Sequence, residues 1–260
     1  MSTPTAATAA SVADRLSTSR TQQLYRLRLA DSTRDVEAAQ RLRYEIFNIE
    51  LGEGLSSAVV SGLDVDEFDA VCDHLLVEDI ASNTLVGTYR VQMGDRALAG
   101  SGFYSAREFD FGPFLGRASE IVELGRACVH RRHRNLVVLG LLWKGIAHYA
   151  KQHNGRYLMG CSSLTSQDPA EGLALYHALK ERHLAAPEWV THPMPGFECQ
   201  GERTDPTPVR APKLMSAYFS IGAKICGQPA IDSEFKTIDF LTWVDVLALP
   251  ERVASRYELK

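Results

Sequence analysis

Apolar residues follow two different periods near the start of the chain. Residues 25–30 alternate polar and apolar side chains, which is typical of a strand with one buried face. Leu42, Ile46 and Ile49 then recur at helical spacing, which indicates a helix with one apolar stripe. Ser32 and Asp35 can cap the start of this helix, and the glycines at 52 and 54 predict its end.

The same patterns continue along the rest of the chain. Residues 74–80 and 84–93 predict a hairpin turning at Ser82-Asn83, and 121–129, 156–163 and 238–246 predict strands. Residues 135–152, 169–182 and 213–226 predict helices, the second capped by Asp168 and opened by Pro169. We expect an acidic loop over 52–72, a loop with a short helix over 94–117, and an irregular proline-rich excursion with one strand over 187–212.

The order of these elements predicts an α+β fold with a mixed central sheet flanked by helices. We expect one domain over residues 21–260, which ends in a C-terminal elaboration. Residues 1–20 are rich in alanine, serine and threonine, and we expect a disordered leader there. The longest apolar run, residues 136–146, is interrupted by Gly140, Lys144 and Gly145 and is too short to span a bilayer.

Composition excludes several classes of function. The net charge of −4 argues against a nucleic-acid partner held by overall charge. Five cysteines without CxxC spacing indicate reduced thiols in a cytoplasmic protein, and we expect no metal site. The chain also lacks the G-x-S-x-G, P-loop and G-x-G-x-x-G motifs, so a serine hydrolase or a nucleotide-binding enzyme is disfavoured.

One predicted strand combines a carboxylate with an arginine. Glu123 and Arg126 both lie in 121–129, where residues three apart would normally face opposite ways. Gly125 could supply a bulge that turns both side chains toward one site. A half-buried Glu123 would have a raised pKa and could accept a proton from an attacking ammonium group. The alternative is an ordinary surface glutamate and a structural salt bridge.

A basic loop follows that strand. Residues 130–134 all carry basic or imidazole side chains and directly precede the predicted helix 135–152. The first N–H groups of a helix are unpaired and lie at the positive end of its dipole, so they attract phosphate. This layout suits an acyltransferase whose donor is a thioester on phosphopantetheine. A solvated basic turn is the alternative.

Three further sets of side chains could contact substrates. Arg90 could bind a carboxylate or simply face solvent. Tyr176, on the predicted helix 169–182, could protonate a departing thiolate or belong to the core. Four acidic residues crowd one loop and could clamp an amine or form a solvated turn: Asp64, Asp66, Glu67 and Asp69.

These residues and the element order resemble the GNAT superfamily of N-acyltransferases. The glycine-rich phosphate loop of that superfamily is absent, because the matching residues 134–139 read Arg-Asn-Leu-Val-Val-Leu. Bulky side chains would crowd the pyrophosphate of coenzyme A. A protein-borne phosphopantetheine has no such pyrophosphate, so the departure favours a carrier protein as donor.

A sharper resemblance is to acyl-homoserine lactone synthases and long-chain N-acyl amino acid synthases. Their motifs match Arg43-x-x-x-Phe47, Asp66-x-x-Asp69, Arg90 and Glu123-x-x-Arg126 in this order. The tryptophan that follows the phenylalanine in the lactone synthases is missing, which argues against S-adenosylmethionine as acceptor. Residues 157–163, 183–189 and 218–235 are similar to the ornithine lipid branch, the L-ornithine Nα-acyltransferases. The resemblance covers roughly residues 24–250.

The resemblance implies transfer of a long-chain 3-hydroxyacyl group from acyl carrier protein to the α-amine of ornithine, which gives lyso-ornithine lipid. Glu123 would be the general base and Tyr176 the general acid. Six residues would bind the acceptor or hold the site together: Arg43, Phe47, Asp66, Asp69, Arg90 and Arg126. Six others would bind phosphopantetheine and its carrier, with a backbone N–H near the first polarising the thioester: Cys128, Arg131, Arg132, His133, Arg134 and Asn135.

No cofactor would be bound permanently, and the acyl-phosphopantetheine thioester, on carrier protein or on coenzyme A, would be a co-substrate. The protein would be cytoplasmic, with transient contact to the inner membrane face. The phenylalanines at 103, 109, 111 and 114 would line an acyl channel or belong to the core. Two alternatives stay open: an N-acyl amino acid synthase for another acceptor such as glycine, and a GNAT domain that binds the carrier without turnover.

Overall fold

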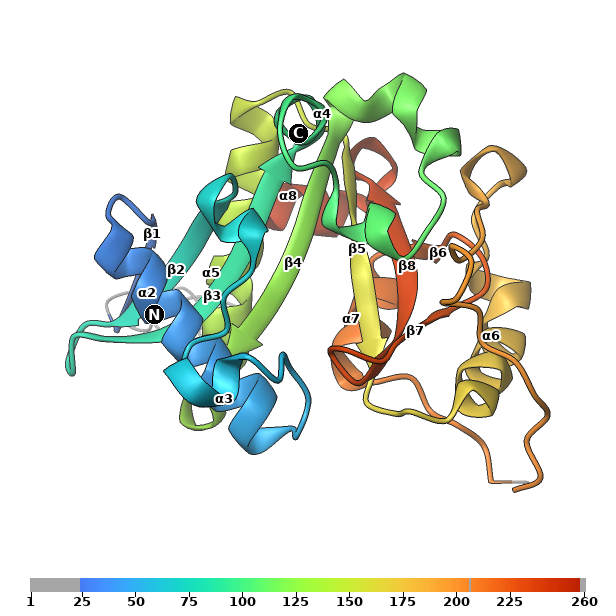
Figure 1. Cartoon of the computed structure of the whole chain (residues 1–260). Helices are drawn as coiled ribbons and strands as arrows, with labels where there is room; N and C mark the ends of the chain where they lie inside the picture. The colour runs from blue at the N-terminus through green and yellow to red at the C-terminus, as the bar shows by residue number, and fades with distance from the viewer. Residues whose placement is uncertain (1–23, 206, 258–260) are drawn as a thin grey trace, which may run out of the picture.

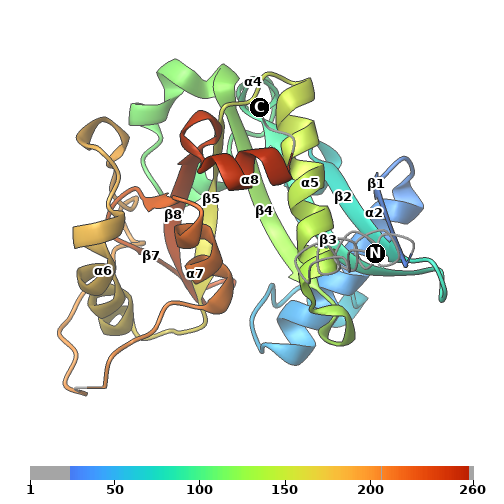
Figure 2. The same cartoon turned by 180° about the vertical axis from the view of Figure 1, so that it is seen from behind.

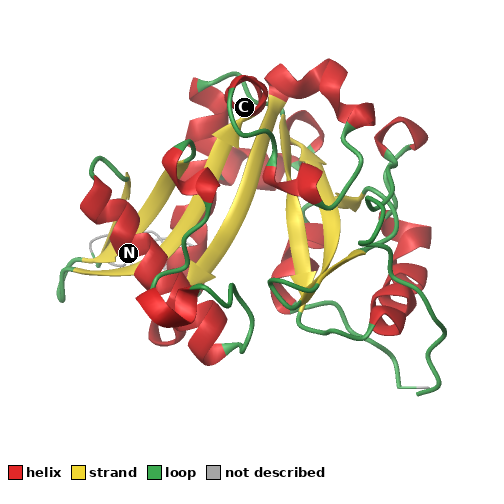
Figure 3. Ribbon diagram, viewed as in Figure 1, coloured by secondary structure: helices red, strands yellow, loops and turns green. Residues whose placement is uncertain are grey.

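The computed structural model describes residues 24–205 and 207–257, so the predicted leader over 1–20 lies outside the described residues. One mixed sheet runs through the described part of the chain, in the order β1-β2-β3-β4-β5-β8-β6, with β7 also paired to β8 (Figures 1 and 3). Each of these pairings is antiparallel except that of β4 with β5. The strands are β1 (Tyr25–Leu29), β2 (Asp73–Asp79), β3 (Thr84–Met93), β4 (Ile121–Val129), β5 (Tyr157–Leu164), β6 (Lys224–Ile225), β7 (Ala230–Asp232) and β8 (Thr237–Asp245).

The α+β prediction with a mixed sheet is confirmed. The hairpin of β2 and β3 turns where expected, and Asn83 adopts the left-handed conformation with φ 52°. The strand predicted over 121–129 has those bounds as β4. Both predicted caps form, since the Ser32 hydroxyl accepts from the N–H of Asp35 and the Asp168 carboxylate accepts from the N–H of Ala170.

Helices cover both faces of the sheet. On the face seen in Figure 2, α5 (Leu136–Gln152) lies over the first strands of the sheet and α7 (Lys213–Ser220) lies beside β5 and β8. Residues of both helices join α8 (Glu251–Arg256) in one apolar cluster. The other face carries α2 (Thr33–Tyr44) and the connection between β3 and β4. α6 (Pro169–His183) lies beside the C-terminal strands (Figure 1). The buried stripe of α5, with Val138, Leu142 and Ile146, is the helical face that its apolar spacing predicted.

Short helical pieces fill the predicted loops. α2 continues as a π-helix over Glu45–Glu50, so the chain stays helical almost to Gly52. The acidic loop contains α3 (Ala58–Ser61) and a 3₁₀ turn, Glu67–Ala70. The β3–β4 connection holds α4 (Gly94–Ala99) and two 3₁₀ segments, Tyr104–Arg107 and Gly112–Glu120. Further 3₁₀ turns are Arg131–His133, Pro187–Trp189 and Val246–Ala248.

Three sequence expectations about elements were wrong. Ile49 is 66% exposed, because the π-helix rotates it out of the apolar stripe. The helix predicted over 213–226 stops at Ser220, since Gly222 takes φ +104° and the chain then pairs with β8 as β6. The strand expected within 187–212 is replaced by isolated bridges, because prolines in this segment cannot donate to a ladder.

Candidate active site

The centre of the site is a fork between β4 and β5. Their parallel pairing covers only residues 121–123 and 157–159, and beyond this point the strands diverge (Figure 1). At the point of divergence a side chain on Gly160 would place its Cβ 2.1 Å from the Leu124 carbonyl oxygen, so only glycine allows this approach. Residues 124–129 therefore present a strand edge without a ladder partner on β5 in the described chain. Such an edge can hydrogen-bond the amides of an extended ligand.

A pocket occupies the fork on the side of α5 and α7. The phenolic oxygens of Tyr89 and Tyr218 lie 2.8 Å apart beside it, and Trp143 reaches it from α5. Burial and the neighbouring Tyr89 raise the pKa of Tyr218 well above its usual value, so this hydroxyl stays protonated. The full lining is mostly apolar: Tyr89, Leu124, Trp143, Leu158, Met159, Gly160, Cys161, Ser162, Tyr218, Ile221, Ala223, Thr242, Trp243 and Val244.

Glu123 lies on the opposite face of β4, because successive strand residues point to opposite faces. Its carboxylate accepts hydrogen bonds from the backbone N–H groups of Tyr104 (2.9 Å) and Ser105 (2.8 Å) and from the Ser105 hydroxyl (2.8 Å). Burial raises the pKa of Glu123 above its usual value, although these hydrogen bonds act in the opposite direction. The carboxylate is thus held in one orientation at the closed end of the fork and has an increased affinity for a proton.

A β-bulge brings Arg126 to the same side as Glu123. The ladder with β3 shifts between Thr88 and Arg90, and Arg126 takes the left-handed backbone conformation with φ 52°. The predicted bulge exists, but it is centred one residue beyond Gly125. An arginine in this conformation is strained and needs its surroundings to hold it. The guanidinium donates to the Tyr104 hydroxyl (3.2 Å) and pairs with Asp66 (3.0 Å).

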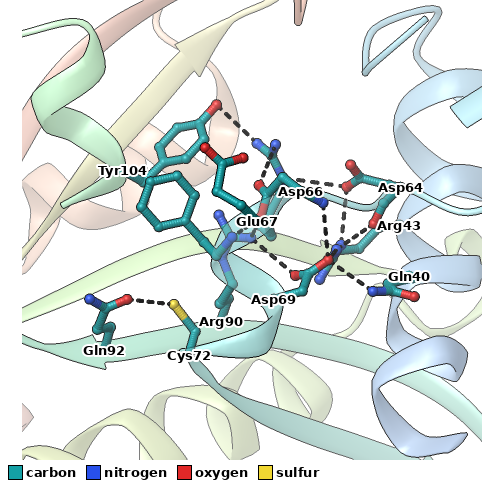
Figure 4. A network of polar contacts seen from close by, with 12 residues as sticks. Gln40, Arg43, Asp64, Asp66, Glu67, Asp69, Cys72, Arg90, Gln92 and Tyr104 are labelled. Carbon is teal, nitrogen blue, oxygen red and sulfur yellow. Dashed lines mark hydrogen bonds and ion pairs between the residues drawn. The ribbon is translucent and has the colours of Figure 1, made fainter. Parts of the chain in front are cut away.

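The other charged residues of the sequence motifs form a buried ion network and are not exposed to solvent. Figure 4 shows Arg43 between Asp64 and Asp69, and Arg90 beside Asp66 and Asp69. The N–O distances are 3.0 and 2.7 Å for Arg43, and 2.5 and 3.0 Å for Arg90.

With Arg126, the network holds three guanidinium groups and three carboxylates, and each carboxylate touches at least one guanidinium. Burial alone would raise the pKa of Asp66, but Arg90 and Arg126 outweigh it and keep the pKa below its usual value. The charges are balanced inside the network. Of the two roles open for Asp66 and Asp69, this arrangement favours the buried scaffold over a clamp for an amine.

Phe47 and Cys128 belong to the packing around the network. Both are buried in one apolar cluster with Leu42, and the Phe47 ring meets Phe235 edge-on at 5.2 Å. The Arg126 guanidinium lies over the other partner, 4.4 Å from the centre of the Phe235 ring. The phenylalanines at 103, 109, 111 and 114 are likewise core, in a cluster with Trp189 beside Glu123's face of the sheet.

The basic loop is less free than its sequence indicated. Arg134 makes two hydrogen bonds to the Glu50 carboxylate, and the Tyr25 hydroxyl lies 3.0 Å from His133 Nδ1. The side-chain oxygen of Asn135 already accepts from the N–H groups of Val137 and Val138, so part of the expected phosphate site at this helix start is capped by the protein.

Arg131 and Arg132 are exposed, and within the described ranges their side chains form no ion pair. They are the two cations of this loop that remain available to a ligand.

Tyr176 packs in a third apolar cluster, against residues such as Leu175 and Phe240, with the Lys180 ammonium over its ring. Its contacts are not shared with Glu123, and its assignment as proton donor stays a prediction. Sequence reasoning did not find Tyr89 and Tyr218, which line the pocket, because isolated tyrosines in apolar segments carry no distinguishing pattern.

A second group of buried carboxylates was also missed. Glu108, Asp239 and Cys161 have ligand atoms within 4.8 Å of one another, on the face that carries Glu123. These residues come from three segments that are far apart in the sequence, so motif spacing could not show that they lie together. The sequence contains one indication of this group, which is the acidic residue at position 239 inside the otherwise mostly apolar strand β8.

The sheet of this chain splits at its one parallel pair of strands, and the Glu123 carboxylate lies at the split. The model for the acetyltransferase (GNAT) domain matches residues 42–144. The chain is 35% identical over 249 residues to the L-ornithine N(alpha)-acyltransferase of Agrobacterium fabrum (strain C58), covering 88% of this chain and 84% of that protein. Its identity to the corresponding protein of Brucella abortus (strain 2308) is 33%, over 89% of this chain and 86% of that one.

The chain therefore belongs to the family of L-ornithine N(alpha)-acyltransferases and is an acyltransferase. Among solved structures it is similar in fold to an N-acyl amino acid synthase from uncultured soil microbes. The TM-score is 0.52 at 11% identity, over 86% of this chain and 91% of that one. The expected GNAT-like fold and the resemblance to the ornithine branch are both confirmed.

Proposed function

We propose that this enzyme transfers a long-chain acyl group from a phosphopantetheine thioester to the α-amine of L-ornithine. One observation carries the proposal: a buried, proton-attracting carboxylate, Glu123, stands where β4 and β5 separate and a pocket begins. The named activity of the relatives supplies the acceptor. The fork supplies a place where an extended thioester arm can pair with the free edge of β4.

The reaction removes two protons from the α-ammonium nitrogen of the acceptor and supplies one to the departing thiolate. The α-ammonium of the acceptor loses a proton to Glu123, directly or through a water molecule, and the amine nitrogen attacks the thioester carbon. As the C–N bond forms and the C–S bond breaks, the nitrogen loses its second proton and the thiolate takes up one proton. Tyr176 stays our predicted donor of that proton. The protonated Tyr89–Tyr218 pair beside the pocket is the alternative donor.

The donor thioester would be carried by an acidic carrier protein. The exposed Arg131 and Arg132 lie at the open end of β4, six residues of strand from Glu123, or about 20 Å at the usual rise. An extended phosphopantetheine arm suits this separation. Bulky residues replace the glycine-rich loop that would receive coenzyme A, which supports the carrier protein over free thioesters.

The buried network would act by position. Arg43, Arg90 and Arg126 hold the acidic loop against β3 and β4, and Arg126 and Glu123 both hold the segment at Tyr104. In the described residues no helix has the length and apolar character needed to cross a bilayer. The acylated product is an amphiphile, so we propose transient contact with the inner membrane face as a cytoplasmic protein.

Lipid analysis of cells that express the chain tests the proposal. Mass spectrometry should detect lyso-ornithine lipid, and purified enzyme should acylate ornithine from an acyl carrier protein. Acylated glycine without acylated ornithine would establish the other acceptor class. If the purified protein acylated none of the amines tested, the alternative of a non-catalytic domain that binds the carrier protein would be favoured.

The variant Glu123→Gln tests the base. It keeps the shape of the side chain but cannot accept the proton, so kcat should fall about 100-fold or more at neutral pH. Native activity should rise as pH increases through the raised pKa of Glu123, and the variant should lose that limb of the pH profile. A variant with native kcat and the native pH profile would remove Glu123 from this role.

A further inference from the structure

Three carboxylates are buried together beyond Glu123. Glu108 follows the 3₁₀ segment Tyr104–Arg107, Asp239 lies on β8, and Asp232 ends β7, with exposed fractions of 2%, 4% and 7%. The carboxylates of Glu108 and Asp239 and the sulfur of Cys161 lie within 4.8 Å of one another. We refer to Glu108, Asp232 and Asp239 as the acidic pocket.

Two oxygens of the acidic pocket lack hydrogen-bond partners. Glu108 Oε2 and Asp239 Oδ1 have no partner among the residues that the structure describes. An unpaired carboxylate oxygen in the interior is costly, and native proteins seldom leave one without a functional reason. The nearby Arg126 acts on Glu108, but its own ion pairs go to Asp64 and Asp66.

The contrast with the neighbouring ion network is one of charge balance. There, three carboxylates meet three guanidinium groups, whereas the carboxylates of the acidic pocket form no ion pair with any residue that the structure describes. Burial and mutual repulsion with Asp239 raise the pKa of Glu108 well above its usual value, and burial raises the pKa of Asp239 to about 6. The acidic pocket therefore attracts positive charge, which either protons or a bound cation can supply.

The acidic pocket adjoins the proposed base. Glu123 pairs in register with Met159, Cys161 follows two residues later on β5, and Asp239 lies opposite Ser163. Alternation along the strands therefore places Glu123, Cys161 and Asp239 on one face. Ser105 lies between them, because its hydroxyl donates to Glu123 and also acts on the pKa of the Cys161 thiol.

We infer that Glu108 and Asp239, supported by Asp232, bind the side-chain ammonium of the acceptor amino acid while Glu123 takes the proton from its α-amine. This inference rests on the proposed function and assigns its acceptor specificity to named residues. A diamino acid would extend from Glu123 to the carboxylates of Glu108 and Asp239, with its α-amine at the first and its distal ammonium at the others. Its distal ammonium is held charged, so that nitrogen is not nucleophilic, and acylation is directed to the α-nitrogen.

The test compares ornithine with norvaline, which has the same carbon chain but no distal amine. Native enzyme should prefer ornithine in kcat/KM by roughly 10- to 100-fold, as expected for charge-assisted hydrogen bonds. Glu108→Gln and Asp239→Asn should each reduce that preference at least tenfold, mainly through the KM for ornithine. Norvaline acylation should change less than about threefold. Glu181→Gln, on the exposed side of α6, is the matched control and should keep the native preference.

Folding of the variants is checked by thermal unfolding, where loss of unpaired buried charge should leave the melting temperature unchanged or higher. If a variant does not fold, native enzyme still decides: putrescine should compete with ornithine, and butylamine should compete at least tenfold more weakly.

Several results would overturn the inference. Variants that retain the ornithine preference would do so, as would equal use of ornithine and norvaline by native enzyme. Stabilisation of native protein but not of Asp239→Asn by Mn²⁺ or Ca²⁺, without any change in acceptor preference, would instead identify a metal site. Failure of the proposed function is distinct, since native enzyme would then acylate neither amino acid.

Discussion

At the residue scale, the molecule separates charge that supports the fold from charge that is available for chemistry. Arg43 is fully buried between Asp64 and Asp69, and removal of one partner from such a pair usually costs about 3–5 kcal/mol. Glu123 is different, since N–H and O–H donors hold its carboxylate and, within residues 24–205 and 207–257, it forms no ion pair. Glu108 and Asp239 are different again, because two of their oxygens are unpartnered among the described residues.

That difference makes the stability of the protein depend on pH in a defined direction. The folded-state pKa of Asp239 is about 6 against an ordinary 3.8, so folding takes up a proton between these values. The stability that Asp239 contributes is present below pH 3.8 and is lost as pH rises through 6. Relative to native protein, Asp239→Asn should gain about 1–3 kcal/mol between pH 4 and pH 7.

Urea denaturation at a series of pH values measures this gain. Glu181→Gln serves as the control and should follow the native curve at every pH. A constant difference between Asp239→Asn and native protein across this range would contradict the raised pKa.

At the element scale, the fork depends on one close contact. β4 and β5 stay paired only to residues 123 and 159, and Gly160 then lies against the Leu124 carbonyl.

The strands and most helices could be predicted from the sequence, because each follows from periodicity or from a cap within one segment. The position of the bulge on β4 could be predicted only to within one residue. Its exact position depends on the pairing with β3 and on the residues that bind the Arg126 guanidinium. The acidic pocket could not be predicted, because residues 108, 161 and 239 meet only after the sheet has formed.

Gly160→Ala should therefore damage the closed end of the fork. The new Cβ would lie 2.1 Å from a backbone oxygen, which cannot move away as a flexible side chain could. We expect a loss of at least about 1–3 kcal/mol in the free energy of unfolding, and reduced activity. Gly125→Ala is the matched control on β4, because a Cβ at that position would have no atom of a described residue within 4 Å, and its stability should change by under about 1 kcal/mol. Equal stability of both variants would show that this contact does not hold the strands.

At the scale of the whole molecule, the sheet separates two environments. One face carries the mostly apolar pocket beneath α5 and α7, and the other carries Glu123 and the acidic pocket. The basic loop lies at the far end of β4, where a carrier would deliver its arm. Donor and acceptor would thus approach the fork from different sides.

Charge reversal of the exposed arginines tests carrier docking. Arg131→Glu with Arg132→Glu should raise the KM for an acyl carrier protein tenfold or more at low salt, because both contacts become repulsive, and the effect should shrink as ionic strength increases. Arg252→Glu, on α8, makes one such charge change elsewhere and should have little effect. Steady-state kinetics at two salt concentrations measure this, and an unchanged KM would remove the loop from docking.

The split sheet also constrains how the finished lipid departs. In the proposed reaction, the amide product would have its amino-acid head on the face of Glu123 and its fatty tail toward the pocket on the other face, so the product would span the fork. The product would then leave only after the spent carrier had withdrawn its arm from the fork. Dissociation of the carrier would then limit the rate at which the lipid is released to a bilayer. An excess of unloaded carrier protein should therefore inhibit the enzyme by slowing product release.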